Sequence, residues 1–308
     1  MQGQFSYLGY DALVTLVTLR SAMSDTKFET YDMSRDDSLF ISFLYKTFPG
    51  RLLLSIIIRP IFSKFFGFIM SSGISKPFIS GFVKKNNIDL SEYKDVRYSS
   101  FNEFFWREIK EEFRPVCPNA DDLVAPCDGK LSAYKITDDS VFEIKKSHYD
   151  ITSLLADGQL AEDFSGGICL IFRLMPVDYH RYCYIDDCEV VSRKKIKGVL
   201  HTVRPIAMRR YRIFAQNSRE YAVLKTKNLG KVVQMEVGAL CVGKIINNDG
   251  ENHFSRGQER GMFEFGASTV VMLFQKDAVL VDDVIFENTQ HDMETVVRMG
   301  SRIGGVNF

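Results

Sequence analysis

The sequence predicts an α+β protein in which an N-terminal helical region is followed by a mostly antiparallel, β-rich body. Residues 51–70 are hydrophobic with the spacing of a helix, whereas later apolar runs such as 270–274 are short, rich in β-branched residues and bounded by turn residues. The 308 residues, 45% of them hydrophobic, suffice for a large core. Because the pattern changes after Pro115, we place the helical region at 1–115 and the β-rich body at 116–308.

Charge and cysteine content narrow the class of protein. The 39 basic and 39 acidic residues cancel, so the total charge gives no reason to expect a nucleic-acid partner. The six cysteines are irregularly spaced and form no CxxC pair, which argues against a zinc centre or a redox motif. We therefore expect no metal site, reduced thiols and a cytoplasmic setting.

The segment Arg51 to Met70 is the most hydrophobic part of the chain. Polar residues and Pro60 interrupt it before it reaches the roughly 20 apolar residues of a membrane-spanning helix, and the proline should kink or divide the helix. Between residues 46 and 85 the chain has no acidic residue and seven basic ones, which are Lys46, Arg51, Arg59, Lys64, Lys76, Lys84 and Lys85. This combination favours a helix lying on an anionic lipid surface. A helix buried against the body, with solvated lysines at its ends, explains the pattern equally well.

An amphipathic helix is expected within Leu90 to Glu111, opening at the cap residue Ser100. Phe101, Phe104 and Phe105 share one face of this helix, which we interpret as a core face.

Two polar residues of the body lie beside strand-like runs. Asp128 belongs to the turn Ala125-Pro126-Cys127-Asp128-Gly129, where bonding to nearby backbone amides is enough to explain it. His180 follows the predicted strand 167–175 and lies among aromatic residues and an arginine, a position in which a general base or acid is useful. Nine basic residues between Arg193 and Arg219, with no acidic one, form either a solvated face or a phosphate-binding surface.

Ser268 lies in the stretch Gly266-Ala267-Ser268-Thr269, at the entrance of the predicted strand 270–274. A hydroxyl there would be held by rigid neighbours, although by itself the stretch is explained as a tight turn before a strand. Upstream, residues 221–227 and 231–237 predict a hairpin around Asn228-Leu229-Gly230.

In this order, these motifs resemble the phosphatidylserine decarboxylase proenzymes, a pyruvoyl-dependent family, over residues 75 to 308. The matching segments are Phe101 to Phe105, Ala125 to Gly129, Asp178 to Arg181, Leu200 to Val203, Phe214 to Glu220, Gly238-Ala239 with Val242-Gly243, and Phe265 to Phe274. The resemblance implies a lyase of phospholipid biosynthesis, peripheral on the cytoplasmic side of the cell membrane, with phosphatidylserine and an anionic lipid surface as partners. A homo-oligomer is left open.

The resemblance also implies a self-processing zymogen. The Ser268 hydroxyl would attack the Ala267 carbonyl, an acyl shift and β-elimination would split the chain, and a β chain of residues 1–267 and an α chain of residues 268–308 would remain together. Ser268 would become a pyruvoyl group, the only cofactor, which would form a Schiff base with phosphatidylserine and release carbon dioxide and phosphatidylethanolamine. The reaction needs a base that deprotonates the hydroxyl and a carboxylate that orients the base, so Asp128, His180 and Ser268 are the catalytic candidates.

Two departures from the family pattern affect these assignments. Many members carry a second histidine three places after the first, where this chain has Cys183, and in those members the second residue is the favoured base. We therefore assign the base to His180, with His201 as the alternative. The residue before the serine is usually glycine, and Ala267 in its place would add roughly 1 to 2 kcal/mol of strain if the backbone there has a positive φ.

Two other functions fit the sequence less well. A non-catalytic, lipid-binding relative that no longer cleaves itself would explain the absent second histidine, but not the presence of Asp128, His180 and Ser268. A second enzyme hypothesis keeps the pyruvoyl chemistry and changes the acceptor to another phosphoserine lipid.

Overall fold

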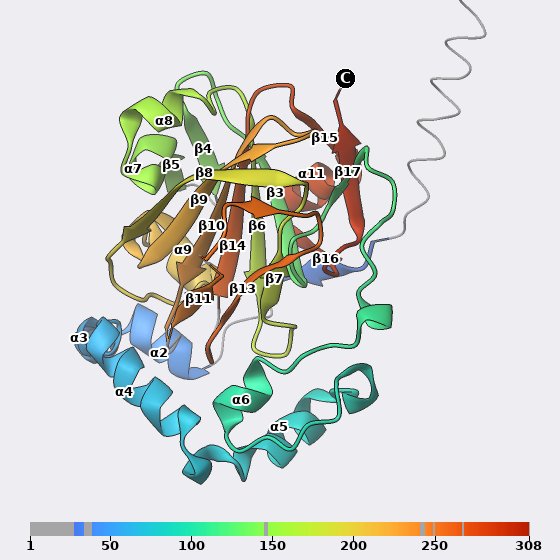
Figure 1. Cartoon of the computed structure of the whole chain (residues 1–308). Helices are drawn as coiled ribbons and strands as arrows, with labels where there is room; N and C mark the ends of the chain where they lie inside the picture. Colours follow the sequence, from blue (N-terminus) through green and yellow to red (C-terminus); the bar gives the residue numbers. More distant parts are fainter. Residues whose placement is uncertain are drawn as a thin grey trace, which may run out of the picture.

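A sheet of nine antiparallel strands runs through the centre of the molecule (Figure 1). The computed structural model describes residues 28–33, 39–144, 147–240, 244–248, 250–266 and 268–307. In spatial order the strands are β1 (Thr30–Asp32), β16 (Met293–Val297), β3 (Gly129–Lys135), β6 (Ile168–Leu174), β14 (Ser268–Phe274), β10 (Lys231–Gly238), β9 (Arg219–Thr226), β8 (Cys188–Ile196) and β12 (His253–Phe254).

Both faces of this sheet are buried, which explains why its central strand is apolar at every position of the run 270–274. Val271 and Leu273 of β14 pack into one hydrophobic core, while Val270, Met272 and Phe274 pack into a second core on the opposite face. The hairpin of β9 and β10 is confirmed, with Gly230 at φ +69° in its turn. Strand β14 is confirmed too, but it already begins at Ser268.

Small sheets and short helices cover the two faces. The first face carries α7 (Ile151–Leu155), α8 (Gly158–Glu162), α9 (Pro205–Met208), α10 (Ile213–Gln216) and the hairpin of β4 (Val141–Ile144) with β5 (Ser147–Asp150). The second face carries two three-stranded sheets and one helix. The first of these sheets has the order β11 (Ile245–Asn247), β13 (Glu259–Phe263) and β7 (Arg181–Cys183), and the other has the order β15 (Val279–Val281), β17 (Arg302–Val306) and β2 (Asp122–Val124). The helix is α11 (Asp283–Gln290).

A layer of helices precedes the body in the chain and lies at one end of the sheet (Figure 1). It contains α2 (Leu39–Lys46), α3 (Phe48–Ile57), α4 (Pro60–Ser71), α5 (Phe78–Asn86) and α6 (Phe101–Phe105), with short 3-10 turns at Gly73–Ser75, Leu90–Glu92 and Glu111–Phe113. The α+β class is therefore confirmed. The domain boundary at residue 115 stays a prediction, and β1 of the central sheet lies before it.

The expected division at Pro60 is present. Helix α3 ends at Ile57 and α4 begins with Pro60 as its first residue, where the missing amide hydrogen leaves no helical bond unmade. Within the described residues, none of the helices has both the length and the apolar character to cross a bilayer alone. The pair α2 and α3, bent by 99°, passes that test only on combined length and composition.

The helix expected within Leu90 to Glu111 is much shorter than predicted. Ser100 does cap α6, because its hydroxyl accepts a hydrogen bond from the Glu103 amide, but the helix ends at Phe105. The prediction was wrong for the flanks because Tyr93 and Ile109 pair as an antiparallel bridge. The three phenylalanines do face a core, as expected.

A buried ion pair ties the small sheet of β7, β11 and β13 to the central sheet. Arg260 of β13 donates two hydrogen bonds of 2.9 Å to Glu236 of β10, and both side chains are almost fully buried. A buried charge is tolerated only when it is paired in this way. The pair therefore holds β7, and with it the preceding loop that carries His180, over the second face of the sheet.

Candidate active site

Ser268 is the first residue of β14, and its side chain is fully buried. It stands between Leu174 of β6 and Gly238 of β10, so the backbone on both sides is part of the ladder. Because side chains alternate along a strand, Ser268 faces the same side as Val270 and Met272. The hydroxyl thus lies at the rim of the second core between two paired strands. This agrees with the expectation that rigid neighbours hold it.

His180 lies in the loop between β6 and β7, and its Nδ1 is 3.2 Å from the Ser268 hydroxyl oxygen. Its other ring nitrogen, Nε2, is 2.9 Å from the Met175 carbonyl oxygen. A carbonyl can only accept a hydrogen bond, so Nε2 carries the proton and Nδ1 has the free lone pair. The ring therefore accepts a hydrogen bond from the Ser268 hydroxyl, which is the orientation a general base requires.

Burial keeps His180 neutral. The side chain has no exposed surface, and loss of solvation lowers its pKa from 6.5 to about 3, although the Met175 carbonyl acts in the opposite direction. The ring of Phe105 packs over the imidazole with centroids 4.0 Å apart and excludes water on that side. At neutral pH the lone pair on Nδ1 is consequently available, at the cost of a weaker intrinsic basicity.

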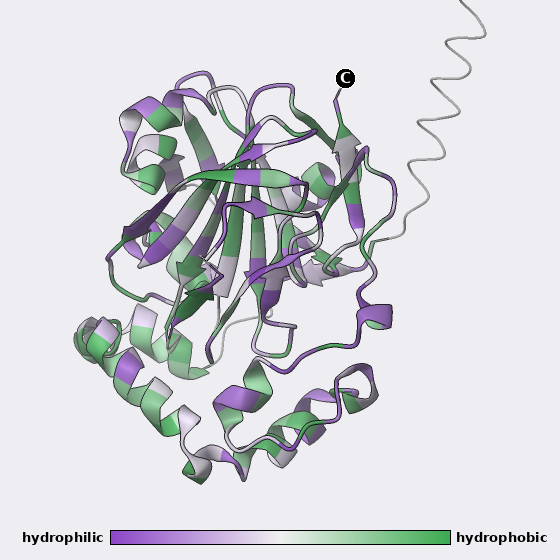
Figure 2. Cartoon of the chain, in the orientation of Figure 1, coloured by the Kyte–Doolittle hydropathy of each residue, from purple (hydrophilic) through white to green (hydrophobic). Residues whose placement is uncertain are grey.

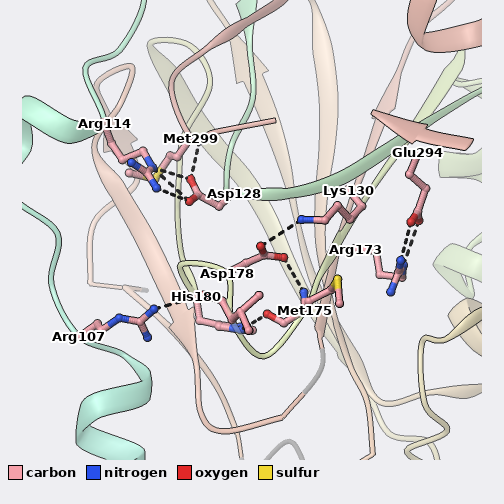
Figure 3. Close-up of polar contacts among 11 residues, drawn as sticks. Arg107, Arg114, Asp128, Lys130, Arg173, Met175, Asp178, His180, Glu294 and Met299 are labelled. Carbon is pink, nitrogen blue, oxygen red and sulfur yellow. Dashed lines mark hydrogen bonds and ion pairs between the residues drawn. The ribbon is translucent and has the colours of Figure 1, made fainter. Parts of the chain in front are cut away.

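Asp178 organises the loop that holds His180. One of its carboxylate oxygens accepts a hydrogen bond of 2.7 Å from the Met175 amide, and the other is 3.2 Å from the Lys130 ammonium (Figure 3). Burial raises the pKa of Asp178, and the charge of Lys130 opposes that effect. Because the same Met175 residue presents its carbonyl to His180, the Asp178 carboxylate fixes the imidazole through the turn between them.

The structure does not bring Asp128 to His180. The Asp128 carboxylate receives hydrogen bonds from the Arg114 guanidinium and from the Met299 amide (Figure 3), and in the described part of the chain none joins it to the imidazole. The imidazole nitrogen that a carboxylate was expected to orient contacts the carbonyl of Met175 instead, the residue that directly follows β6. Asp128 is linked to the site indirectly, because its charge adds to the raised pKa of Asp178.

His201, the alternative base, lies on the other face of the central sheet. Its Nδ1 is 3.1 Å from the Tyr45 hydroxyl, and its ring stacks on Tyr211, with both tyrosines packed in the first core. Burial lowers its pKa to about 4. Because Ser268 faces the second core, a β-strand stands between the two side chains.

Cys183 cannot replace the missing histidine as a base. It is the last residue of β7 and is buried, and burial raises its pKa to about 12. The thiol therefore stays protonated at neutral pH.

Sequence reasoning missed several residues that shape the site. Arg114, Lys130, Met175 and Phe105 each contact Asp128, Asp178 or His180. Lys130 directly follows the Asp-Gly turn and Asp178 directly precedes Tyr179-His180, so proximity to the motifs was the only signal available. Residue 267 and residues 241–243 lie outside the described residues, as does any backbone strain at Ala267.

Many of the cations between Arg193 and Arg219 have protein partners. Arg219 is buried and donates to the backbone carbonyls of Ser153 and Leu154, and Lys195 forms an ion pair with Glu220. A role for this stretch in binding a lipid phosphate stays a prediction. In the described ranges, no three His, Cys, Asp or Glu side chains are arranged to hold a metal ion.

Comparison with known proteins identifies the family. The family model for phosphatidylserine decarboxylase matches residues 101–305, which is more than half of the chain. The chain belongs to the phosphatidylserine decarboxylase family. The resemblance noted from the motifs is thus confirmed.

Curated members of the phosphatidylserine decarboxylase family match this chain over most of its length. Phosphatidylserine decarboxylase proenzyme 2 of Clostridium acetobutylicum is 44% identical over 268 residues, covering 87% of this chain and 92% of the relative. The corresponding proenzyme of Ruminiclostridium cellulolyticum is 41% identical over 268 residues, covering 85% and 89%. That of Clostridium perfringens is 38% identical over 285 residues, covering 90% and 97%.

The low pKa values predict that acid weakens the fold of this family member. In the unfolded chain, histidines bind protons below about pH 6.5, whereas His180 and His201 in the folded chain do so only near pH 3 and pH 4. The free energy of unfolding should therefore fall as the pH drops from 6.5 to 4, by at most about 1.4 kcal/mol per pH unit for each histidine. Urea unfolding of the Ser268→Ala chain at several pH values measures this slope.

His180→Gln in the same chain should make that slope shallower, because one of the two groups is removed. The exposed His291→Gln is the matched control for loss of a histidine. Equal slopes in the His180 and His291 variants would contradict the burial argument.

Proposed function

We propose that this chain is a self-processing decarboxylase that converts phosphatidylserine to phosphatidylethanolamine and carbon dioxide, with a pyruvoyl group made from its own Ser268. The observation that carries the proposal is the 3.2 Å contact between His180 Nδ1 and the buried Ser268 hydroxyl. Membership of the family and the names of its curated proenzymes support both the substrate and the self-processing. No observation favours the non-catalytic alternative.

Self-cleavage begins with transfer of the Ser268 hydroxyl proton to His180 Nδ1. The oxygen then attacks the carbonyl carbon of Ala267, the proton passes to the departing Ser268 amine, and an ester replaces the peptide bond. β-Elimination breaks the ester, giving the Ala267 carboxylate and a dehydroalanine at position 268, and water converts the dehydroalanine to the pyruvoyl group with loss of ammonia. His180 is competent for the first step because its Nε2 proton is committed to the Met175 carbonyl. The site is also dry, so the attacking oxygen competes with little solvent.

The residues around position 268 fit a pyruvoyl group. Such a group supplies a carbonyl that withdraws electrons from the substrate carbon that loses carbon dioxide. The flanking strands β6 and β10 hold position 268 in the ladder, and the position is fully buried beside His180, on which Phe105 packs. Because His180 already contacts this position, it is placed to hold or deliver a proton during decarboxylation.

Asp128 enters the proposal as a residue that supports the site rather than as the partner of the imidazole. Together with Arg114 it forms a buried ion pair with a contact of 2.7 Å, beside the Asp178 carboxylate that orders the His180 loop. We assign His201 no role in proton transfer, because its ring is engaged by Tyr45 on the opposite face.

We further propose that the helical layer docks on an anionic lipid surface, which makes the enzyme peripheral on the cytoplasmic side of the cell membrane. Large apolar side chains of this layer are solvent-exposed, and Figure 2 shows hydrophobic residues recurring along its helices. On α3 and α4 the most exposed are Phe48, Leu52, Ile56, Ile61, Phe65 and Phe68, with 57% to 77% of their surface accessible. All seven basic residues between 46 and 85 are exposed as well.

Ser268→Ala is expected to leave the chain whole and inactive, because the attacking hydroxyl is removed. The unaltered protein should instead yield a fragment of residues 268–308 with a mass of about 4.7 kDa, as 35.2 kDa over 308 residues implies. Intact-mass measurement of both proteins, with an assay of phosphatidylethanolamine formation, checks this. A Ser268→Ala chain that still produced phosphatidylethanolamine would disprove the mechanism.

His180→Ala is expected to slow self-cleavage by about 10²- to 10⁴-fold, the usual contribution of a general base. His201→Ala should cleave at nearly the unaltered rate, and Asp128→Ala should show a smaller loss than His180→Ala because its effect passes through Asp178. Time courses of fragment release from freshly synthesised protein measure all three. If His201→Ala stayed whole while His180→Ala cleaved normally, the base assignment would be reversed.

Phe65→Ser combined with Phe68→Ser should weaken binding to vesicles of phosphatidylcholine and phosphatidylglycerol by at least tenfold, since burial of each ring is worth about 2 kcal/mol. Sedimentation with vesicles measures the bound fraction, and phosphatidylglycerol supplies negative charge without being the substrate. Val191→Ser is the control, because Val191 is equally exposed but lies on β8 of the body. Equal losses in both proteins would argue against a docking face on the helices.

A further inference from the structure

The segment 264–266, which leads to the cleavage position, is hydrogen-bonded at its start to the β-rich body. After β13 ends at Phe263, three residues connect it to residue 267 and β14. The Phe263 amide donates a hydrogen bond of 3.0 Å to the His180 carbonyl, and the Glu264 amide donates one of 2.9 Å to the Lys244 carbonyl. The connection is therefore tied at its start to the residue that carries the base.

Its next residue is held from the other side by Asn102 of α6. The Phe265 amide donates a hydrogen bond of 2.8 Å to Asn102 Oδ1, and Asn102 is fully buried. The other end of the same side-chain amide, Nδ2, donates a 2.9 Å hydrogen bond to the hydroxyl of Ser71, the last residue of α4. A backbone N–H can only donate, so one orientation of the Asn102 amide serves both partners.

Aromatic packing reinforces this contact. The ring of Phe265 meets Phe101 and Phe105 of α6 with centroids 5.0 and 5.1 Å apart, and Phe66 of α4 at 5.9 Å. Phe105 is also the residue that packs over His180. Helix α6 therefore touches both the imidazole and Phe265, which lies in the segment that leads to the cleavage position.

We propose that Asn102 is a positioning residue for self-cleavage. By holding the Phe265 backbone, it would present the carbonyl of Ala267, two residues further on, to the Ser268 hydroxyl. The inference rests on the proposed self-processing. A positioning contact is needed because the segment 264–266 lies outside the ladder that fixes Ser268. A displacement of about 1 Å between reacting groups can cost roughly 10²-fold in rate. Among the described residues, the Asn102 side chain bonds to Phe265 and Ser71 and not to the Ser268 hydroxyl, so we expect its effect to be on alignment.

The test compares self-cleavage rates of freshly synthesised chains. Asn102→Leu, which has similar volume and no acceptor, should release the fragment of residues 268–308 about 10- to 100-fold more slowly than the unaltered chain. Ser71→Ala is the matched control that removes only the Nδ2 partner, and it should cleave within about threefold of normal. A normal rate for Asn102→Leu, or an equal slowing by Ser71→Ala, would overturn the proposal.

A conservative variant separates positioning from general stability. Asn102→Asp keeps the acceptor for the Phe265 amide. The Glu264 carboxyl lies close enough for Asn102 to stabilise its charged form, so Glu264→Gln is made in the same chain to avoid placing two carboxylates side by side. This double variant should regain most of the cleavage rate, with Glu264→Gln alone as its reference. No recovery in a folded double variant would overturn the proposal, and this comparison holds even if Asn102→Leu does not fold.

Activity per cleaved molecule provides the second readout. Once cut, the Asn102→Leu enzyme should decarboxylate at close to the normal rate per mole of α chain, because the alignment it lost concerns only the cleavage step. An equal loss in both rates would indicate a structural role and overturn the proposal. Failure of the unaltered chain to cleave would instead disprove the self-processing itself, so the two failures are distinguishable.

Discussion

The hydrogen bond from His180 Nε2 to the Met175 carbonyl is the constraint on which the candidate site depends. It determines which ring nitrogen carries the proton, and so it makes Nδ1 the acceptor for the Ser268 hydroxyl. A neutral carbonyl does this in a buried site without adding a charge that would need its own partner. The charged groups Asp178 and Lys130 stand one step further away, where they pair with each other and order the turn.

We propose two roles for the helical layer, and the residues for both are interleaved along the same helices. Its exposed face carries apolar and basic side chains suited to lipid, while its inner face supplies Phe66, Phe105 and Asn102 to the segment before Ser268. Substrate lipid and reacting groups would therefore meet at one end of the central sheet.

The central sheet divides the titratable residues into two groups by face. His180 and Ser268 belong to the second face, whereas His201 is engaged with Tyr45 and Tyr211 on the first. The central sheet thus separates two buried histidines whose pKa values are both low. Burial lowers both pKa values, so our proposal of His180 as the base rests on its contact with Ser268 and not on its pKa.

The sequence by itself determined the α+β class, the division of the hydrophobic segment at Pro60, the buried strand after Ser268 and the family, because periodicity, proline chemistry and ordered motifs are local properties. Only the tertiary structure decided which side chains meet. Asp128 was expected beside His180, yet it pairs with Arg114, and the imidazole is oriented by Met175. The shortness of helix α6 and the pairing of Tyr93 with Ile109 likewise could not be predicted from the sequence. Contacts between residues distant in the chain depend on how strands alternate and cross, and no local pattern encodes that geometry.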